Sequence, residues 1–184
     1  MPETVTRNLP VLALRGVTAF PGQTVSFDVE REISIYALDN AMESDRRIFA
    51  ITQKELSTSE PGERDLYAVG TVCHILQIVK TSDTTVRVVV EGESRARLLR
   101  LWQTQPFLQG QAELLPEQSA RSTARTEALL RRTYVLFDDY RQLASGLSDD
   151  FTAAVLDCRD AGELADLIAQ NITLRHQDRQ RVLE

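Results

Sequence analysis

Residues 69–91 read VGTVCHILQIVKTSDTTVRVVVE, and this stretch determines the class of fold that the sequence predicts. Two segments rich in β-branched residues, Val69–Lys80 and Val86–Glu91, flank the polar sequence 81–85. β-branched residues pack well on a pleated sheet, and a short polar connection between two such segments is typical of a β-hairpin. We therefore predict an antiparallel pair of strands here, with Gly92 marking a bulge or bend and a separate strand at 94–102.

The segments on either side extend the sheet. Thr24–Val29 alternates apolar and polar residues, which is the period of a half-buried strand. Further strands are expected at Val11–Leu14, Ile48–Thr52 and 107–115. Helical spacing occurs once in this region, at Ile33–Met42, where Ser34 is a candidate cap. Several strands with short turns and few helices predict a small, mostly antiparallel barrel or folded-over sheet.

Beyond Pro116 the apolar period becomes helical. One stripe steps by four and three residues along the chain, and three further residues widen it: Leu129, Thr133, Leu136, Tyr140 and Leu143, with Leu130, Tyr134 and Phe137. We expect this stripe to be the packing face of a helix. Ser148 and Asp160 are expected to cap two further helices, and Thr173 a fourth. The sequence thus predicts an α+β protein with a β-rich domain at 1–117 and a helical bundle subdomain at 118–184, truncated in its last helix.

The segment after Thr173 has apolar residues at Leu174, Val182 and Leu183, but it is too short for a stable isolated helix. We therefore expect it to dock on the helices of 122–172, to pair with a second copy, or to fray.

Composition excludes several classes of protein. Hydrophobic residues make up 42% of the 184, which is ordinary for a globular chain. Leu66–Val79, the longest stretch without Asp, Glu, Lys or Arg, is too short and too polar to span a bilayer. The two cysteines form no disulfide framework and the start lacks a secretory signal, so a cytoplasmic location is expected. The net charge of −6 argues against a general nucleic-acid binder.

The motifs of common enzymes are absent from the sequence. No glycine is followed by lysine, which excludes a phosphate-binding P-loop, and GxGxxG, HExxH and GxSxG do not occur. The lysines are Lys54 and Lys80, and neither belongs to a recognisable Ser–Lys pair. We therefore expect no catalytic residue, no metal site and no cofactor in this chain.

Several ordered blocks carry a resemblance to a known family. They are Leu9–Gly16 with Phe20-Pro21-Gly22, Glu30–Leu38, Gln53-Lys54, Leu66–Thr71, Val90–Arg97, 164–166 and 180–184. Together they resemble the N-terminal, substrate-binding domain of the ATP-dependent Lon protease family. Ala13 and Glu30 depart from the Pro and Gly that are usual in that family, which affects local loop shape.

The resemblance implies a PUA-like pseudo-barrel followed by helices. It implies recognition of unfolded or damaged proteins and assembly into a homo-oligomer, a hexamer for the full-length protein and a monomer or weak dimer for this piece. ATP and Mg²⁺ would serve ATPase and Ser–Lys protease domains that are absent here. Two alternatives remain open: a stand-alone adaptor or regulatory protein, and a PUA-like RNA-binding module, which would need a basic groove.

As a hypothesis, Leu14, Phe20, Pro21 and Val79 expose apolar surface for unfolded chains. The alternative for Leu14 and Phe20 is packing in the core.

Overall fold

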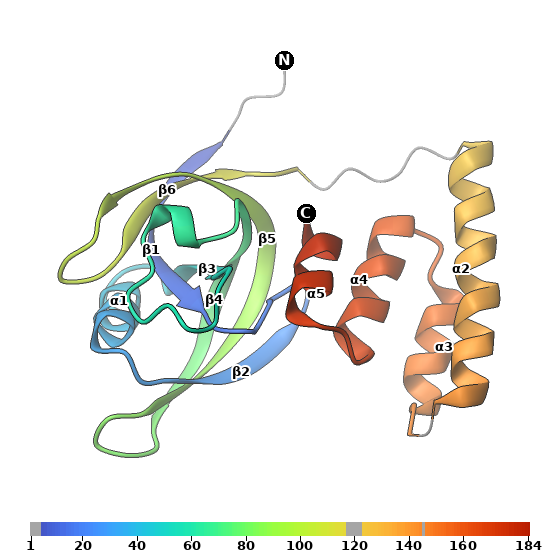
Figure 1. Cartoon of the computed structure of the whole chain (residues 1–184), viewed down its shortest axis with the longest axis horizontal. Coiled ribbons are helices and arrows are strands. Elements are labelled where there is room, and N and C mark those ends of the chain that lie inside the picture. Colours follow the sequence, from blue (N-terminus) through green and yellow to red (C-terminus); the bar gives the residue numbers. More distant parts are fainter. Residues whose placement is uncertain (1–4, 117–122, 145) are drawn as a thin grey trace. The chain divides into compact units, whose positions relative to one another are not determined.

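The computed structural model describes residues 5–116, 123–144 and 146–184 (Figure 1). The chain divides into two compact units, one of residues 1–117 with 175–184 and the other of residues 118–174. We call them the barrel unit and the helical unit. The boundary predicted at 117/118 lies outside the described residues. The α+β class is confirmed, because strands fill the first unit and helices the second.

The barrel unit is built on one six-stranded sheet in the part of the chain that is described. Its strands are β1 (Thr6–Leu14), β2 (Thr24–Val29), β3 (Arg47–Thr52), β4 (Val69–Lys80), β5 (Val86–Gln103) and β6 (Gln109–Leu114). They follow the order β2-β5-β4-β3-β1-β6, and β5 also pairs with β6. Five strands therefore close into a ring, and β2 is added to it at β5. The pairs are antiparallel except β1 with β3, which is parallel.

The β4–β5 hairpin forms as predicted, with Lys80 opposite Val86. The separate strand expected at 94–102 is instead a continuation of β5, and a register shift beside Gly92 marks the bulge. Gly92 is needed because another segment crosses it. Its N–H donates to the carbonyl of Gln23 at 2.9 Å, and a β-carbon there would lie 2.0 Å from the carbonyl oxygen of Phe20. The glycine therefore permits both the bend and this close approach.

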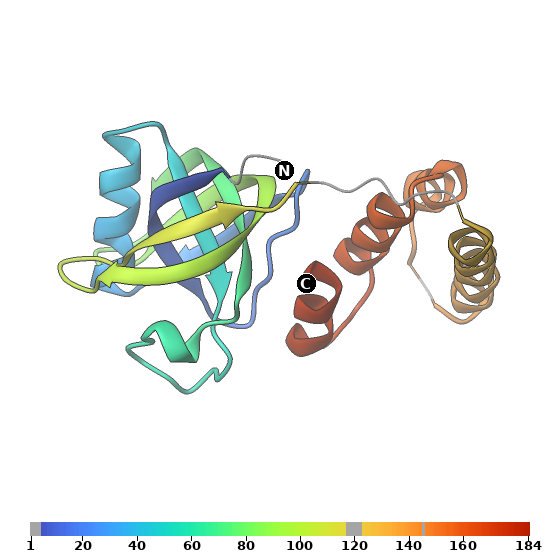
Figure 2. The same ribbon diagram turned by 90° about the horizontal axis from the view of Figure 1, so that it is seen from above.

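Helix α1 (Glu32–Met42) packs beside the barrel, as Figure 2 shows. It buries Ala37, Leu38 and Ala41 in one core cluster with residues of β1 and β3. The predicted cap at Ser34 is wrong, because the helix begins one turn earlier, after Arg31, and Ser34 is buried inside it. A short 3-10 helix, Glu63–Asp65, interrupts the loop between β3 and β4.

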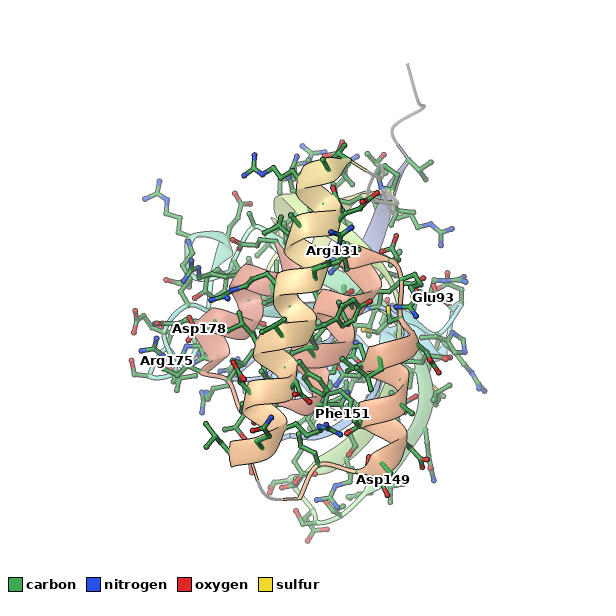
Figure 3. All side chains as sticks on the ribbon, turned by 90° about the vertical axis from the view of Figure 1, so that its right-hand side faces the viewer. Glu93, Arg131, Asp149, Phe151, Arg175 and Asp178 are labelled. Atoms are coloured by element: carbon green, nitrogen blue, oxygen red, sulfur yellow. The ribbon has the colours of Figure 1, made fainter. Side chains whose placement is uncertain are left out.

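The helical unit contains α2 (Ala124–Leu143), α3 (Asp149–Asp157) and α4 (Ala161–Asn171). The predicted caps are confirmed: Ser148 Oγ accepts from the N–H of Phe151 at 3.1 Å, and Asp160 Oδ1 accepts from that of Gly162 at 2.8 Å. Phe137 of α2 meets Phe151 of α3 edge to face, with ring centroids 5.5 Å apart. Phe151 is labelled in Figure 3. Around this pair lies a small core.

The packing face predicted for α2 is confirmed for one part of the stripe and wrong for the other. Leu130, Tyr134 and Phe137 pack inward, whereas Leu129, Leu136 and Leu143 are 59%, 51% and 89% exposed. The two stripes lie about a quarter-turn apart on the helix. Both have helical periodicity, and the period alone does not say which one faces the core.

Helix α5 (His176–Leu183) begins after Arg175, so the predicted start at Thr173 is wrong. It belongs to the barrel unit and not to the helical subdomain in which 118–184 placed it. Gln180 Nε2 donates to the carbonyl of Val69 at 2.8 Å, and Arg95 Nε donates to that of Leu183 at 2.9 Å. The segment is therefore docked on the barrel, which none of the three expectations for it included.

Candidate functional site

The centre of the candidate site is Arg31, which directly precedes α1. Its guanidinium donates to Gln53 Oε1 at 2.6 Å, to the carbonyl of Thr58 at 3.3 Å and to that of Ala13 at 3.5 Å. Desolvation and the charge of Arg15 lower the pKa of Arg31. Because three acceptors hold the guanidinium, Arg31 ties α1 to β1 and to the loop after β3.

Gln53 completes this clamp from the other side. It is fully buried, and its Nε2 donates to the carbonyls of Glu55 at 2.6 Å and Thr58 at 3.1 Å. A buried amide that uses its acceptor and both donors is strongly oriented. The loop after β3 is thereby held in a defined conformation next to the first turn of α1.

Two pockets adjoin at Arg31. The first, which we call the strand pocket, has a volume of about 280 Å³. Its walls are mainly apolar side chains from the ends of β1 and β2, with charged groups among them: Leu12, Ala13, Leu14, Arg15, Val17, Phe27, Asp28, Val29, Glu30, Arg31 and Ser34. A site of this composition accommodates an apolar side chain and hydrogen-bonding groups together.

The second pocket, the loop pocket, measures about 600 Å³. It lies between the first turns of α1 and the loops 59–62 and 104–108. Tyr36, 45% exposed, forms part of its wall, and its hydroxyl donates to Glu32 Oε1 at 2.9 Å. This hydrogen bond and the charge of the carboxylate raise the pKa of Tyr36. The volume lies within the usual range of ligand sites, roughly 300–1,000 Å³.

Strand edges border the strand pocket. In the described residues β2 pairs only with β5, so its other edge is unpaired. Residues 11–14 of β1 pair with β3, and two of their backbone groups have further partners: the Val11 N–H donates to the carbonyl of Leu108 at 2.8 Å, and the Ala13 carbonyl accepts from Arg31. The open edge beside the pocket is therefore that of β2. An unpaired strand edge presents backbone N–H and C=O groups that a further extended chain can bind. The pocket therefore combines apolar walls with backbone hydrogen-bonding capacity.

The four residues that the sequence suggested as a binding surface lie in different surroundings in the structure. Phe20 is fully buried and Leu14 is 4% exposed, so neither exposes an apolar surface patch. Leu14 nevertheless lines the strand pocket, whereas Phe20, Pro21 and Val79 line neither pocket. Pro21-Gly22 forms the predicted turn, with Gly22 at φ 71°. Val79 is 41% exposed near the β4–β5 hairpin.

Sequence reasoning missed Arg31, Gln53 and Tyr36 as site residues. Arg31 and Tyr36 lie within the quoted block Glu30–Leu38, and Gln53 opens another block, so the resemblance was the signal that pointed to them. Nothing in the local pattern indicates that these side chains converge. The contact between Arg31 and Gln53 depends on the parallel pairing of β1 with β3, which brings Gln53 beside the end of β1.

The described residues offer neither a metal cluster nor a thiol with a lowered pKa. Across the described ranges no group of three or more His, Cys, Asp or Glu side chains could hold a metal ion. Burial raises the pKa of the Cys73 thiol to about 12, so this sulfur is not an activated nucleophile. Among the described residues, no helix is both long enough and apolar enough to cross a membrane.

Comparison with known proteins identifies the relatives of this chain. A family model described as the ATP-dependent protease La (LON) substrate-binding domain matches residues 8–184. Lon protease 1 of Bacillus subtilis is 35% identical over 184 residues, which is 100% of this chain and 24% of the relative. The Lon protease of Syntrophomonas wolfei is 39% identical over 178 residues, 97% of this chain and 22% of the relative. The chain thus spans less than a quarter of the length of these relatives.

Two solved structures share the fold. The N-terminal domain of the Mycobacterium avium complex Lon protease has a TM-score of 0.52 and 20% identity, covering 96% of each chain. A Lon N-terminal domain protein from Xanthomonas campestris has a TM-score of 0.50 and 17% identity, covering 84% of this chain and 92% of that one.

Proposed function

Because this chain belongs to the family of Lon substrate-binding domains, we propose that it binds unfolded or damaged polypeptides and has no catalytic activity of its own. The observation that carries the proposal is the pair of pockets adjoining at Arg31, next to an unpaired strand edge. Unfolded chains differ from folded ones in offering both free backbone groups and apolar side chains. The pockets are suited to both.

The mode of binding follows from this geometry. An extended segment pairs with the outer edge of β2, and its alternate side chains enter the strand pocket and the loop pocket. Backbone pairing accepts many sequences, whereas the apolar walls favour hydrophobic segments. Affinity is modest, because ordering a disordered chain opposes binding.

The pockets do not favour RNA as the ligand. Arg15 and Arg31 are accompanied by Asp28, Glu30 and, in the loop pocket, Glu32 and Glu60. A groove for phosphates is expected to be predominantly basic. An adaptor that binds unfolded proteins outside a larger enzyme would use the same site, and an ATPase region in the same reading frame would decide between the two.

In a longer protein of this family, ATP hydrolysis with Mg²⁺ and peptide cleavage would belong to domains outside this chain. The chain would act there as part of a cytoplasmic homo-oligomer. Purified chain is expected to hydrolyse neither ATP nor peptides. Turnover that a point mutation within the chain abolishes would contradict this.

The binding proposal is tested with a fluorescently labelled, permanently unfolded polypeptide, whose anisotropy reports binding. Tyr36→Ala removes an exposed aromatic side chain from the loop pocket, and we expect the dissociation constant to rise about tenfold. The matched control is Val79→Ala, because Val79 is similarly exposed but lies outside both pockets. Equal effects of the two changes would place the binding site elsewhere. A wild-type chain that does not prefer the unfolded polypeptide to its folded form would overturn the function itself.

A further inference from the structure

An unusual apolar stripe remains exposed on α2. Leu129, Leu136 and Leu143 are more than half exposed, and Tyr140 is 37% exposed on the same face. Together with the half-buried Thr133 they repeat at intervals of four and three residues. This is the spacing of the a and d positions of a coiled coil, here sustained over about two heptads and ~21 Å of helix. Contiguous exposed apolar surface of this kind marks an interaction site.

We propose that this stripe is a self-association surface, on which α2 of a second copy of the chain packs in an antiparallel coiled-coil pair. The proposal adds a surface to the homo-oligomer proposed above and does not depend on substrate binding. The inner stripe, Leu130, Tyr134 and Phe137, is occupied by the core of the helical unit. The outer stripe is thus available without disturbing that core.

Charge favours the antiparallel direction. On the exposed flank of the stripe, Arg125 and Arg132 belong to the first half of α2, and Asp139 belongs to the second half. Arg131 pairs with Glu127 at 3.6 Å and Arg141 with Asp138 at 2.7 Å, and neither pair involves Arg132 or Asp139, which are both exposed. In an antiparallel pair Arg132 of each copy faces Asp139 of the other. In a parallel pair Arg132 of each copy would instead lie beside Phe137 of the other, so this attraction between opposite charges would be lost.

The length of the stripe limits the strength of the pair. Stable two-stranded coiled coils normally extend over at least three or four heptads. A surface of about two heptads therefore produces a weak, concentration-dependent dimer. Its association is strengthened wherever other contacts hold copies of the chain together, because the effective concentration is then high.

The first test is sedimentation of the 184-residue chain over a range of concentrations. Leu136→Asp is expected to raise the dimer dissociation constant at least about tenfold, because it places a charge in the stripe of both copies. Val135→Asp is the matched control: Val135 is 54% exposed and adjacent in sequence, but it points away from the stripe. Circular dichroism verifies that both variants remain folded. Equal effects of the two substitutions, or a wild-type chain that stays monomeric throughout, would overturn the proposal.

The second test determines direction by disulfide formation. In the antiparallel pair Leu129 of one copy lies opposite Tyr140 of the other, whereas in a parallel pair each lies opposite itself. A mixture of Leu129→Cys and Tyr140→Cys proteins should form the mixed dimer, and neither alone should cross-link. Cross-linking of each variant with itself would refute the antiparallel arrangement. The charge reversal Arg132→Glu should weaken the dimer, and adding Asp139→Arg should restore it; failure to restore would also contradict the proposal.

Discussion

The barrel unit and the helical unit are stabilised in different ways. In the barrel, β4 and β5 are each paired with a neighbouring strand on both sides. Two clusters of buried residues fill the interior. In the helical unit, the consecutive helices α2, α3 and α4 share one small cluster of buried residues: Phe137, Phe151, Val155 and Leu164. A unit with few buried side chains has little hydrophobic stabilisation to offset chain entropy. We therefore expect the two units to unfold separately, with the helical unit less stable than the barrel unit.

The largest effect is expected in the barrel. Gly92→Ala places a methyl group 2.0 Å from the backbone carbonyl of Phe20, so the crossing segment has to move. We expect a loss of about 4 kcal/mol, measured by urea denaturation. Gly62→Ala is the control, because a β-carbon there meets only Asp65 Oδ2, at 3.7 Å. A change below about 1 kcal/mol for Gly92→Ala would mean that segment 20–23 does not press on β5 as described.

In the helical unit, Phe151→Ala removes one ring of the edge-to-face pair. The expected loss is about 3 kcal/mol, sufficient to unfold this unit while the barrel stays native. Hydrogen exchange read separately for 124–171 and for the strands would detect this difference. Leu156→Ala, on the exposed side of the same helix, should have little effect. If Phe151→Ala also abolished protection of the barrel strands, the two units would be one cooperative structure.

The reaction rates of the two cysteines allow the stability of the two units to be compared in the unsubstituted protein. Cys73 is fully buried in the barrel, and Cys158 is half-buried in the helical unit. With a thiol reagent near pH 8 we expect Cys158 to react at least about 100-fold faster, because Cys73 becomes accessible only when the barrel opens. Peptide mapping after timed labelling measures both rates. Equal rates would show that the barrel opens as readily as the helical unit.

The Cys73 thiol makes the stability of the barrel unit depend on pH. Burial raises the pKa of Cys73 from 9.0 to about 12, so the folded state holds the proton more tightly than the unfolded state. The contribution of this thiol to the free energy of unfolding is therefore fully present below pH 9, and it is lost as the pH rises towards about 12. Cys73→Ala should make unfolding less sensitive to pH across that range.

The smallest effect concerns α5. Gln180→Ala removes the hydrogen bond to the carbonyl of Val69 and leaves a buried acceptor with one partner fewer. We expect a loss of about 1.4 kcal/mol in docking, seen as about tenfold faster exchange of the amides of 176–183. Exchange in the barrel strands should be unchanged. Gln177→Ala, exposed on the same helix, is the control, and an equal effect of that change would mean that Gln180 does not anchor α5.

Elements whose signals are local could be predicted from the amino-acid sequence. β-branched content and alternation predicted the β4–β5 hairpin and β2, and hydroxyl and carboxylate side chains at Ser148 and Asp160 predicted two helix starts. These features depend on backbone preferences and on hydrogen bonds between residues close in sequence. The ordered blocks from Leu9 onward likewise predicted the family, because they can be recognised without knowing the fold.

Which surfaces are buried, and where distant segments meet, depends on the packing of the whole chain. α2 has two apolar stripes of the same period, and the one that packs depends on α3 and α4. Gln180 binds Val69 from 111 positions away, and Arg31 reaches Gln53 and Ala13 through the parallel pairing of β1 with β3. Periodicity indicates that a face is apolar, but it does not name the partner. The partner is selected by the burial and hydrogen bonding of the whole chain, which no local pattern contains.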